Sequence, residues 1–209
     1  MSTGADRRSR RDACDGRRGQ AHTLEGIIAG LLVLSSIVFA LQVTAVTPLS
    51  ASTSSQHIQN QQRAASAGVL ASAAESGALE RTALYWDESG PSFHDTGPRG
   101  RYASAPPTEF GTLLEETFDR RGIAYNVYVT FAIPGDDQRR IQMVYQGAPS
   151  DSAVRVSHTV TLTDDAALRA ADGTPTTTNV SETDSFYAPD VSRTGLYNVL
   201  SVEVVVWRI

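Results

Sequence analysis

The distribution of apolar residues divides the chain into regions with different periods. Residues 1–19 contain almost no apolar side chains and cannot bury enough surface to fold alone. Residues 26–46 follow as an apolar run with no charge and only four polar side chains. At a helical rise of about 1.5 Å per residue this run spans about 31 Å, which matches a hydrocarbon core of about 30 Å. The run therefore predicts a helix that can cross a membrane.

The charges on the two sides of this run differ. Residues 1–19 hold six Arg against three Asp, and the next basic residue after the run is Arg63. Because a basic flank stays in the cytoplasm, we expect the N-terminus inside the cell and the bulk of the chain outside. A cleaved secretory signal is the alternative, since Val43-Thr44-Ala45 fits a signal peptidase site. The run is, however, longer than the about 7–15 apolar residues of a signal core.

The region after the run is polar and rich in alanine. Pro48 predicts a kink or break in the helix, because proline lacks an amide donor. A second helical stretch is expected from about Thr53 to Ala74, with Ile58, Ala65 and Val69 on one small apolar face that packs on the domain. The Ser, Gln and Ala content of this stretch leaves a flexible stalk as the alternative.

A loop and a short helix come next. Residues 87–107 are punctuated by Gly and Pro and predict a long loop. Thr108 fits an N-cap, and Gly122 fits the end of the helix that follows. Four apolar residues form the stripe of that helix: Phe110, Leu113, Leu114 and Phe118.

From Ile123 onward the period changes from helical to two. Residues 123–133 and 139–147 alternate on either side of a Pro-Gly turn and predict a hairpin. Residues 153–163 also alternate, and the run from 196 to 209 is too hydrophobic for an edge strand. We therefore expect an antiparallel sheet of at least four strands. The intervening segment is expected to be mostly loop, with one helical turn near Ala166–Ala170.

These elements predict an α+β fold, in which a long N-terminal hydrophobic helix precedes an antiparallel β-sheet head. The expected organisation is a basic leader at 1–19 and a transmembrane and assembly helix at 20–47. A helical stalk at 48–86 and an extracytoplasmic head at 87–209 complete it.

One carboxylate, Glu25, stands at the N-terminal end of the apolar run. Such a charge is unfavourable by about 2.5–3.5 kcal/mol at the bilayer centre on insertion scales, and by less near the surface. The dipole of a helix N-terminus would offset about 0.3–1 kcal/mol, with Thr23 as a possible cap. This interpretation makes Glu25 a first-turn residue with a structural role.

The junction ahead of Glu25 has a second interpretation. Four residues form it: Arg17, Arg18, Gly19 and Gln20. A basic leader, this junction, a Glu and then an apolar run resemble the class III signal of type IV pilins and archaellins. The resemblance implies that a prepilin-type peptidase cuts before the apolar run, which stays in the mature protein. Cleavage after Gly19 would make Glu25 the sixth mature residue, and cleavage after Gln20 would make it the fifth.

The resemblance also implies a role for Glu25 in assembly. In that family the carboxylate pairs with the new α-amino group of a neighbouring subunit, so the head would be pilin-like and the chain would associate with itself or with other pilin-like subunits. Gly26 and Gly30 form a small-xxx-small pair that lets helices approach closely. His22 has no counterpart in the family pattern.

The composition indicates a type of source organism and argues against one class of partner. All 18 basic residues are Arg, against 23 acidic residues, and the net charge is -5. In its lack of Lys and its excess of acidic residues, the chain resembles uncharacterised pilin-like membrane proteins of haloarchaea. Codon bias alone would also produce this composition. Beyond Gly19 the chain holds 12 Arg against 20 acidic residues. Such a body repels phosphate backbones, so nucleic acid is not expected as a partner.

Residues that could act in catalysis or bind a metal are dispersed along the sequence. The four histidines are His22, His57, His94 and His158, and no two of them have ligand spacing. Asp87 and Glu88 with His94-Asp95 could supply ligands for calcium, but a solvated acidic loop is the favoured interpretation. The single cysteine, Cys14, has no disulfide partner. No Gly-x-Ser-x-Gly elbow or phosphate-binding loop occurs. We therefore expect no catalytic residue, metal or cofactor.

Asn179-Val180-Ser181 is a glycosylation sequon, which could be modified if the head lies outside the cell. The expected function is thus a non-enzymatic pilin-like subunit in the cell membrane, which could assemble into a cell-surface filament or secretion structure. A single-pass anchored binding module that does not polymerise is the main alternative, and a secreted enzyme released by signal peptidase is a third.

Overall fold

The computed structural model describes residues 6–135, 137–192 and 194–208, and within these ranges it describes side chains for residues 22–42 and from residue 56 onward. The chain separates into two compact units, Met1–Gln56 and His57–Ile209. The boundary falls inside the predicted stalk at 48–86. We call the second unit the head.

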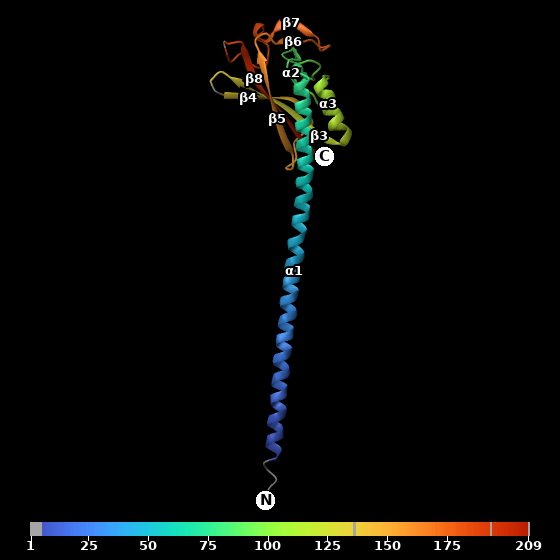
Figure 1. Ribbon diagram of the computed structural model, residues 1–209, viewed down its shortest axis with the longest axis vertical. Helices are drawn as coiled ribbons and strands as arrows, with labels where there is room; N and C mark the ends of the chain where they lie inside the picture. Colours follow the sequence, from blue (N-terminus) through green and yellow to red (C-terminus); the bar gives the residue numbers. More distant parts are fainter. Residues whose placement is uncertain (1–5, 136, 193, 209) are drawn as a thin grey trace. The chain divides into compact units, whose positions relative to one another are not determined.

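The first helix, α1, extends from Asp6 to Glu75 (Figure 1). It includes the stretch from Thr53 to Ala74, which the sequence predicted to be helical. It also continues through Pro48, so the predicted break is wrong. Proline removes only its own amide donor, and the hydrogen bonds of the neighbouring turns are sufficient to maintain a helix.

The part of α1 that belongs to the head packs one face into its core. Val69, Leu70 and Ala73 are buried there. Gln62 and Ser66 are buried on the same face, and Ser66 Oγ donates to Gln62 O at 2.8 Å. The prediction that a small apolar face packs on the domain is therefore confirmed for Ala65 and Val69, whereas Ile58 is not among the residues packed against the core.

A four-stranded antiparallel sheet forms the centre of the head (Figure 1). Its strands are β3 (Ile123–Ile133), β4 (Asp137–Tyr145), β5 (Val154–Thr163) and β8 (Leu196–Arg208). The spatial order is β4-β3-β8-β5, so the predicted hairpin pairs as expected. The hydrophobic run at the C-terminal end of the sequence occupies a central position, which explains why its residues are buried on both faces of the sheet.

Two short helices and a turn precede the sheet. They are α2 (Ala78–Ala83), α3 (Glu109–Thr117) and the 3-10 turn η1 (Asp119–Arg121). Thr108 caps α3 as predicted, because its side chain accepts a hydrogen bond from Gly111 N at 3.3 Å. Gly122 ends η1 in the left-handed region, with φ 64°.

Two small sheets were not predicted. One pairs β1 (Trp86–Asp87) with β2 (Ser92–Phe93), inside the expected loop. The other pairs β6 (Ala167–Arg169) with β7 (Pro175–Asn179), and a 3-10 turn, η2 (Val180–Glu182), follows it.

The helical turn predicted near Ala166–Ala170 is therefore wrong. Leu168 is buried in the core between two half-buried neighbours, an alternation that suits a strand. Arg169 N also donates to Leu84 O at 2.9 Å, which anchors this segment in an extended conformation. These tertiary contacts override the helix propensity of the alanines.

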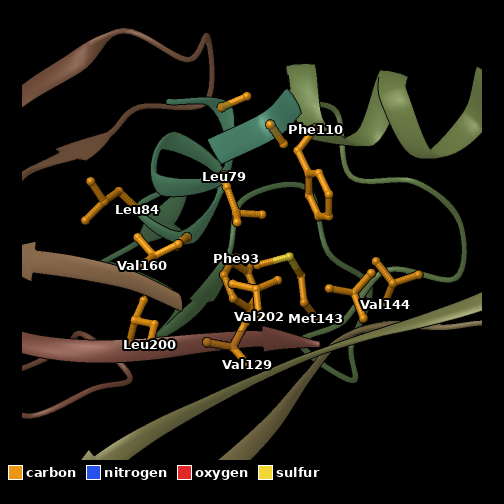
Figure 2. Packing of buried hydrophobic residues seen from close by; sticks show 14 of the residues in the cluster. Leu79, Leu84, Phe93, Phe110, Val129, Met143, Val144, Val160, Leu200 and Val202 are labelled. Carbon is orange, nitrogen blue, oxygen red and sulfur yellow. The ribbon is translucent and has the colours of Figure 1, made fainter. Parts of the chain in front are cut away.

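The main core lies between the helices and one face of the sheet. Figure 2 shows Leu79 of α2, Phe110 of α3 and Phe93 of β2 gathered near Met143 and Val202 from the sheet. The second buried cluster contains Ala124, Val205 and Trp207 and is separate from this core. The fold is thus α+β, with an N-terminal apolar helix followed by antiparallel sheets, as the sequence predicted.

Candidate functional site

The first candidate site is the apolar part of α1. His22–Gln42 is the one helical segment in the described part of the chain that is long and apolar enough to cross a membrane, with 21 residues and a mean hydropathy of 2.3. None of its side chains is buried. A signal sequence near an N-terminus has the same length and composition, so these two properties alone do not separate an anchor from a signal.

The exposure of this segment is unusual for its composition. Ile28 is 51% exposed and Phe39 is 69% exposed, and the other large apolar side chains of the segment lie between these values. Moving one such side chain completely out of water is favourable by about 1.5–3 kcal/mol of free energy. A contiguous apolar surface of this kind marks a site for lipid or for another protein.

Glu25 has an in-chain partner at the start of this segment. Its Oε2 lies 3.7 Å from Nδ1 of His22, one helical turn earlier. Both side chains are highly exposed, at 81% for Glu25 and 83% for His22. The contact is an ion pair only when His22 is protonated. It gives His22 a neighbour that sequence reasoning did not find, although the i,i+3 spacing was visible.

The helix-terminus interpretation of Glu25 does not hold for the full chain. Because α1 begins at Asp6, Glu25 is its twentieth residue and lies far beyond the first turn. The dipole effect falls off within one turn of the end, and Thr23 lies inside the helix instead of at its N-cap. Glu25 could reach a helix N-terminus only if the preceding residues were removed.

The two glycines near Glu25 face open space. A Cβ atom added at Gly26 or at Gly30 would meet no heavy atom within 4 Å. Packing among the described residues therefore does not require a glycine at either position. One polar residue within the run is satisfied locally, since Ser36 Oγ donates to Leu32 O at 2.8 Å.

The predicted processing residues Arg17, Arg18, Gly19 and Gln20 belong to the backbone of α1, but their side chains lie outside the described residues. The same is true of Cys14. Cleavage at this junction stays a prediction.

The sequon occupies a structured turn. Asn179 is half-buried and caps η2. Its backbone N donates to Glu182 Oε2 at 3.0 Å. Val180 is fully buried, and Ser181 Oγ donates to Asp164 O at 2.7 Å. Modification of Asn179 stays a prediction as well, and these contacts show that the folded turn already occupies the serine hydroxyl.

The head contains a polar cavity of about 440 Å³ beside α2 and α3. It is lined by residues of both charges, and Arg81 Nη2 donates to Glu109 Oε2 at its edge. Tyr85 O–H, also in the lining, donates to Asp95 Oδ2 at 2.9 Å and to Ala171 O at 2.6 Å. Burial, and then the neighbouring Asp95, raise the pKa of Tyr85 to about 12.

Arg169 completes one wall of this cavity, and its buried Nε makes no hydrogen bond with the described residues. Its carbonyl oxygen lies 2.9 Å from His94 Nε2, and this contact gives the histidine a structural role. Among the described residues, no group of three or more His, Cys, Asp or Glu side chains could hold a metal ion.

The chain matches a known protein family. No curated protein and no solved structure matches the chain. A family of unknown function, DUF7288, matches residues 18–206. The match includes the apolar segment, Glu25 and nearly all of the head, so both units of the structure are parts of one family pattern. The chain therefore belongs to the family DUF7288.

Proposed function

We propose that this chain is a non-enzymatic, pilin-like membrane subunit, which is inserted through the apolar segment of α1 and displays the head outside the cell. A prepilin-type peptidase would cut at Gly19 or Gln20 and leave the apolar segment in place. Copies of the chain, or related subunits, would then pack side by side through this segment. The basic residues before the segment support an N-terminus in the cytoplasm.

One observation carries the proposal: the exposed apolar segment has a single carboxylate, Glu25, at its N-terminal end. A helix satisfies all of its backbone groups inside lipid, so the apolar residues need no further partner there. Glu25 does need one, because a charge within a membrane helix is unfavourable unless it is paired. The α-amino group freed by cleavage on a neighbouring copy would supply a positive charge at neutral pH.

Cleavage would also change the electrostatics of Glu25 within its own chain. If the mature protein began at Gln20, Glu25 would lie near the end of the helix, where exposed amides favour a negative charge by about 0.3–1 kcal/mol. The contact with His22 would add to this only while the imidazole is protonated. Assembly would add the α-amino group of a neighbouring copy as a second partner of Glu25.

Two further features support contact between copies. Gly26 and Gly30 leave a notch on the helix surface with none of the described residues against it, which suits the close approach of a second helix. The family match also begins at residue 18, next to the proposed cleavage site, and covers the segment together with the head. The alternative of a binding module that does not polymerise is favoured by the open cavities of the head.

N-terminal sequencing of the protein from native membranes tests processing. We expect a mature start at Gln20 or Ala21. A start near Val46 in the medium would contradict retention of the apolar segment, and an intact Met1 or Ser2 would favour the uncut anchor.

Assembly is tested separately by cross-linking in membranes of cells that express variants. Glu25→Gln should abolish most cross-linked multimers, because it removes the charge and keeps the size of the side chain. Glu75→Gln is the matched control, since Glu75 is an exposed carboxylate at the other end of α1. Multimers that persist unchanged in Glu25→Gln would overturn the pairing role.

A further inference from the structure

Three arginines that are separated in the sequence line one open cavity of the head. Arg99 and Arg101 follow β2, and Arg140 lies on β4. The cavity has a volume of about 770 Å³, and Trp86, Tyr128 and other aromatic residues also line it. We call this cavity the arginine groove. Sequence reasoning missed it because no local spacing connects residue 140 with residues 99 and 101.

The charge of the arginine groove is opposite to that of the chain. No Asp or Glu lines it, whereas the cavity beside α2 and α3 has Glu109, Glu115 and Asp172 in its lining. The chain as a whole has a net charge of -5. Glu203 lies outside the lining and pairs with Arg140, so it neutralises one of the three arginines. Arg99 and Arg101 have no carboxylate beside them in the lining, so the groove keeps a positive excess that favours anions.

Two of the arginines are held in position by aromatic rings. The guanidinium of Arg140 lies over the ring of Tyr128, 3.7 Å from the centroid, and donates to Glu203. The guanidinium of Arg101 lies over the ring of Tyr145, 4.6 Å from the centroid.

The hydrogen bonds of Arg101 leave it able to bind a ligand. It donates through Nη1 to Gln142 Oε1. A guanidinium carries five N–H donors in a fixed plane, so further donors remain for a ligand. A planar donor fork that is already positioned suits a carboxylate or a similar oxyanion.

The groove continues into a second hollow. Arg99 and Arg101 also line a neighbouring cavity of about 470 Å³, together with Tyr102, Tyr145 and Pro98. The two cavities thus share two arginines, and together they form a longer surface that carries both cationic and aromatic groups. Such a surface fits an extended ligand with repeated anionic groups better than a single small ion.

We propose that the arginine groove binds an acidic polysaccharide, in which carboxylates are carried on sugar rings. The carboxylates would meet the arginines, while the hydroxyls would meet polar groups such as Ser92 and Gln142. Of the aromatic residues in the lining, half-buried Tyr128 would offer apolar surface to a sugar ring, whereas Trp86 and Phe93 are buried. A nucleic acid fits less well, because its continuous phosphates would also meet the acidic surface outside the groove. This inference goes beyond the proposed assembly function and holds whether or not the chain polymerises.

The test uses the full chain in a non-ionic detergent and measures binding to immobilised polygalacturonate. Binding should weaken as salt rises, because the groove contacts are electrostatic and open to solvent. Fully methyl-esterified polygalacturonate, which has the same sugar backbone without the charge, should bind at least about tenfold more weakly. Binding of the ester at equal strength would overturn the proposal.

Variants locate the site. Arg99→Gln should weaken binding at least about fivefold, since it removes one exposed charge from the groove. Arg99 makes no hydrogen bond or ion pair with the described residues that its loss would break, so this variant should fold normally. Arg155→Gln is the matched control, because Arg155 is exposed on β5 and is absent from the lining of the groove. Equal losses in the two variants, or none in Arg99→Gln, would contradict a site in the groove.

Competition identifies the ligand class. Polyglutamate and single-stranded DNA of matched charge should compete at least about tenfold less well than free polygalacturonate. If polyglutamate competed equally, the groove would be a site for acidic protein segments. If DNA competed equally, it would be a general polyanion site. Either result would overturn the assignment to a polysaccharide.

Discussion

The side chain of Asn198 hydrogen-bonds both backbone groups of Ala132 on the neighbouring strand. Its Oδ1 accepts from Ala132 N at 3.2 Å, and its Nδ2 donates to Ala132 O at 3.0 Å. Nδ2 also donates to Pro189 O at 2.7 Å. The backbone pairing of β3 with β8 ends at Phe131 and Leu200. Asn198, which is fully buried, therefore extends the connection between these strands with a side chain.

Asn198→Ala should destabilise the head by about 2–4 kcal/mol, because two backbone amides, of Ala132 and Val199, and two carbonyls lose their side-chain partner. Urea unfolding in detergent, followed by tryptophan fluorescence, measures this change, since both tryptophans belong to the head. Val199→Ala is the neighbouring control, as Val199 is 42% exposed, and it should change stability by less than about 0.5 kcal/mol. Similar losses in the two variants would show that the amide has no special role.

Two helical glycines should respond to alanine in opposite directions. A Cβ atom at Gly111 would lie 1.8 Å from Pro106 O, and a backbone atom cannot move away easily. Gly111→Ala should therefore destabilise the head by about 3 kcal/mol. At Gly68, inside α1, an added Cβ meets nothing within 4 Å. Gly68→Ala should stabilise the head by about 0.5–1 kcal/mol, because alanine favours a helix. Thermal unfolding that lowered stability in both would contradict this distinction.

Thr108 should contribute through its cap and through a contact with α2. Its Oγ1 accepts from Gly111 N and also accepts from Thr82 Oγ1 at 2.8 Å. Thr108→Ala should destabilise the head by about 1–2 kcal/mol, while Thr108→Ser should restore most of this loss because serine keeps the hydroxyl. Urea unfolding of the pair decides the matter, and equal stability of the two variants would argue against the capping role.

The head should unfold in alkali in step with ionisation of its tyrosines. Burial is the first cause that raises the pKa of both Tyr85 and Tyr197 to about 12, from an ordinary value of 10.0. Burial also raises the pKa values of Tyr102, Tyr125 and Tyr187. The unfolded chain therefore loses these protons first, and stability that is fully present below pH 10 declines as pH rises toward 12.

Phenolate absorbance and circular dichroism in the same titration measure this transition. Tyr85→Phe should lose less stability between neutral pH and pH 12 than the unchanged protein does, because one ionisable hydroxyl is gone. A titration in which the buried tyrosines ionise near pH 10 while the fold persists would contradict the burial argument.

Patterns that are local in the sequence predicted the fold well. Alternation along residues 123–133 and 153–163 identified two strands, and a cap followed by an apolar stripe identified α3. The β6–β7 pair was missed because its strands are short and depend on tertiary contacts such as that of Leu168 with the core. Continuation of α1 through Pro48 was missed because a single proline was given too much weight.

The sites were predicted less completely than the fold. Glu25 stood out because a charge beside an apolar run is visible in one dimension. The arginine groove was invisible, since its three arginines meet only after the segment around Tyr102 has paired with β4 at Val144. The role of Asn198 was hidden for the same reason, because an asparagine inside a hydrophobic strand has no local signal for its partner on another strand.

The central place of β8 also orders events during synthesis. Among the described strands of the central sheet, β8 is made last, yet both β3 and β5 need it as a neighbour. The β3–β4 hairpin can pair earlier, because both of its strands precede β8 in the chain. During synthesis β5 and one edge of β3 therefore lack a partner until β8 arrives, and in that interval the incomplete sheet would be vulnerable to proteolysis.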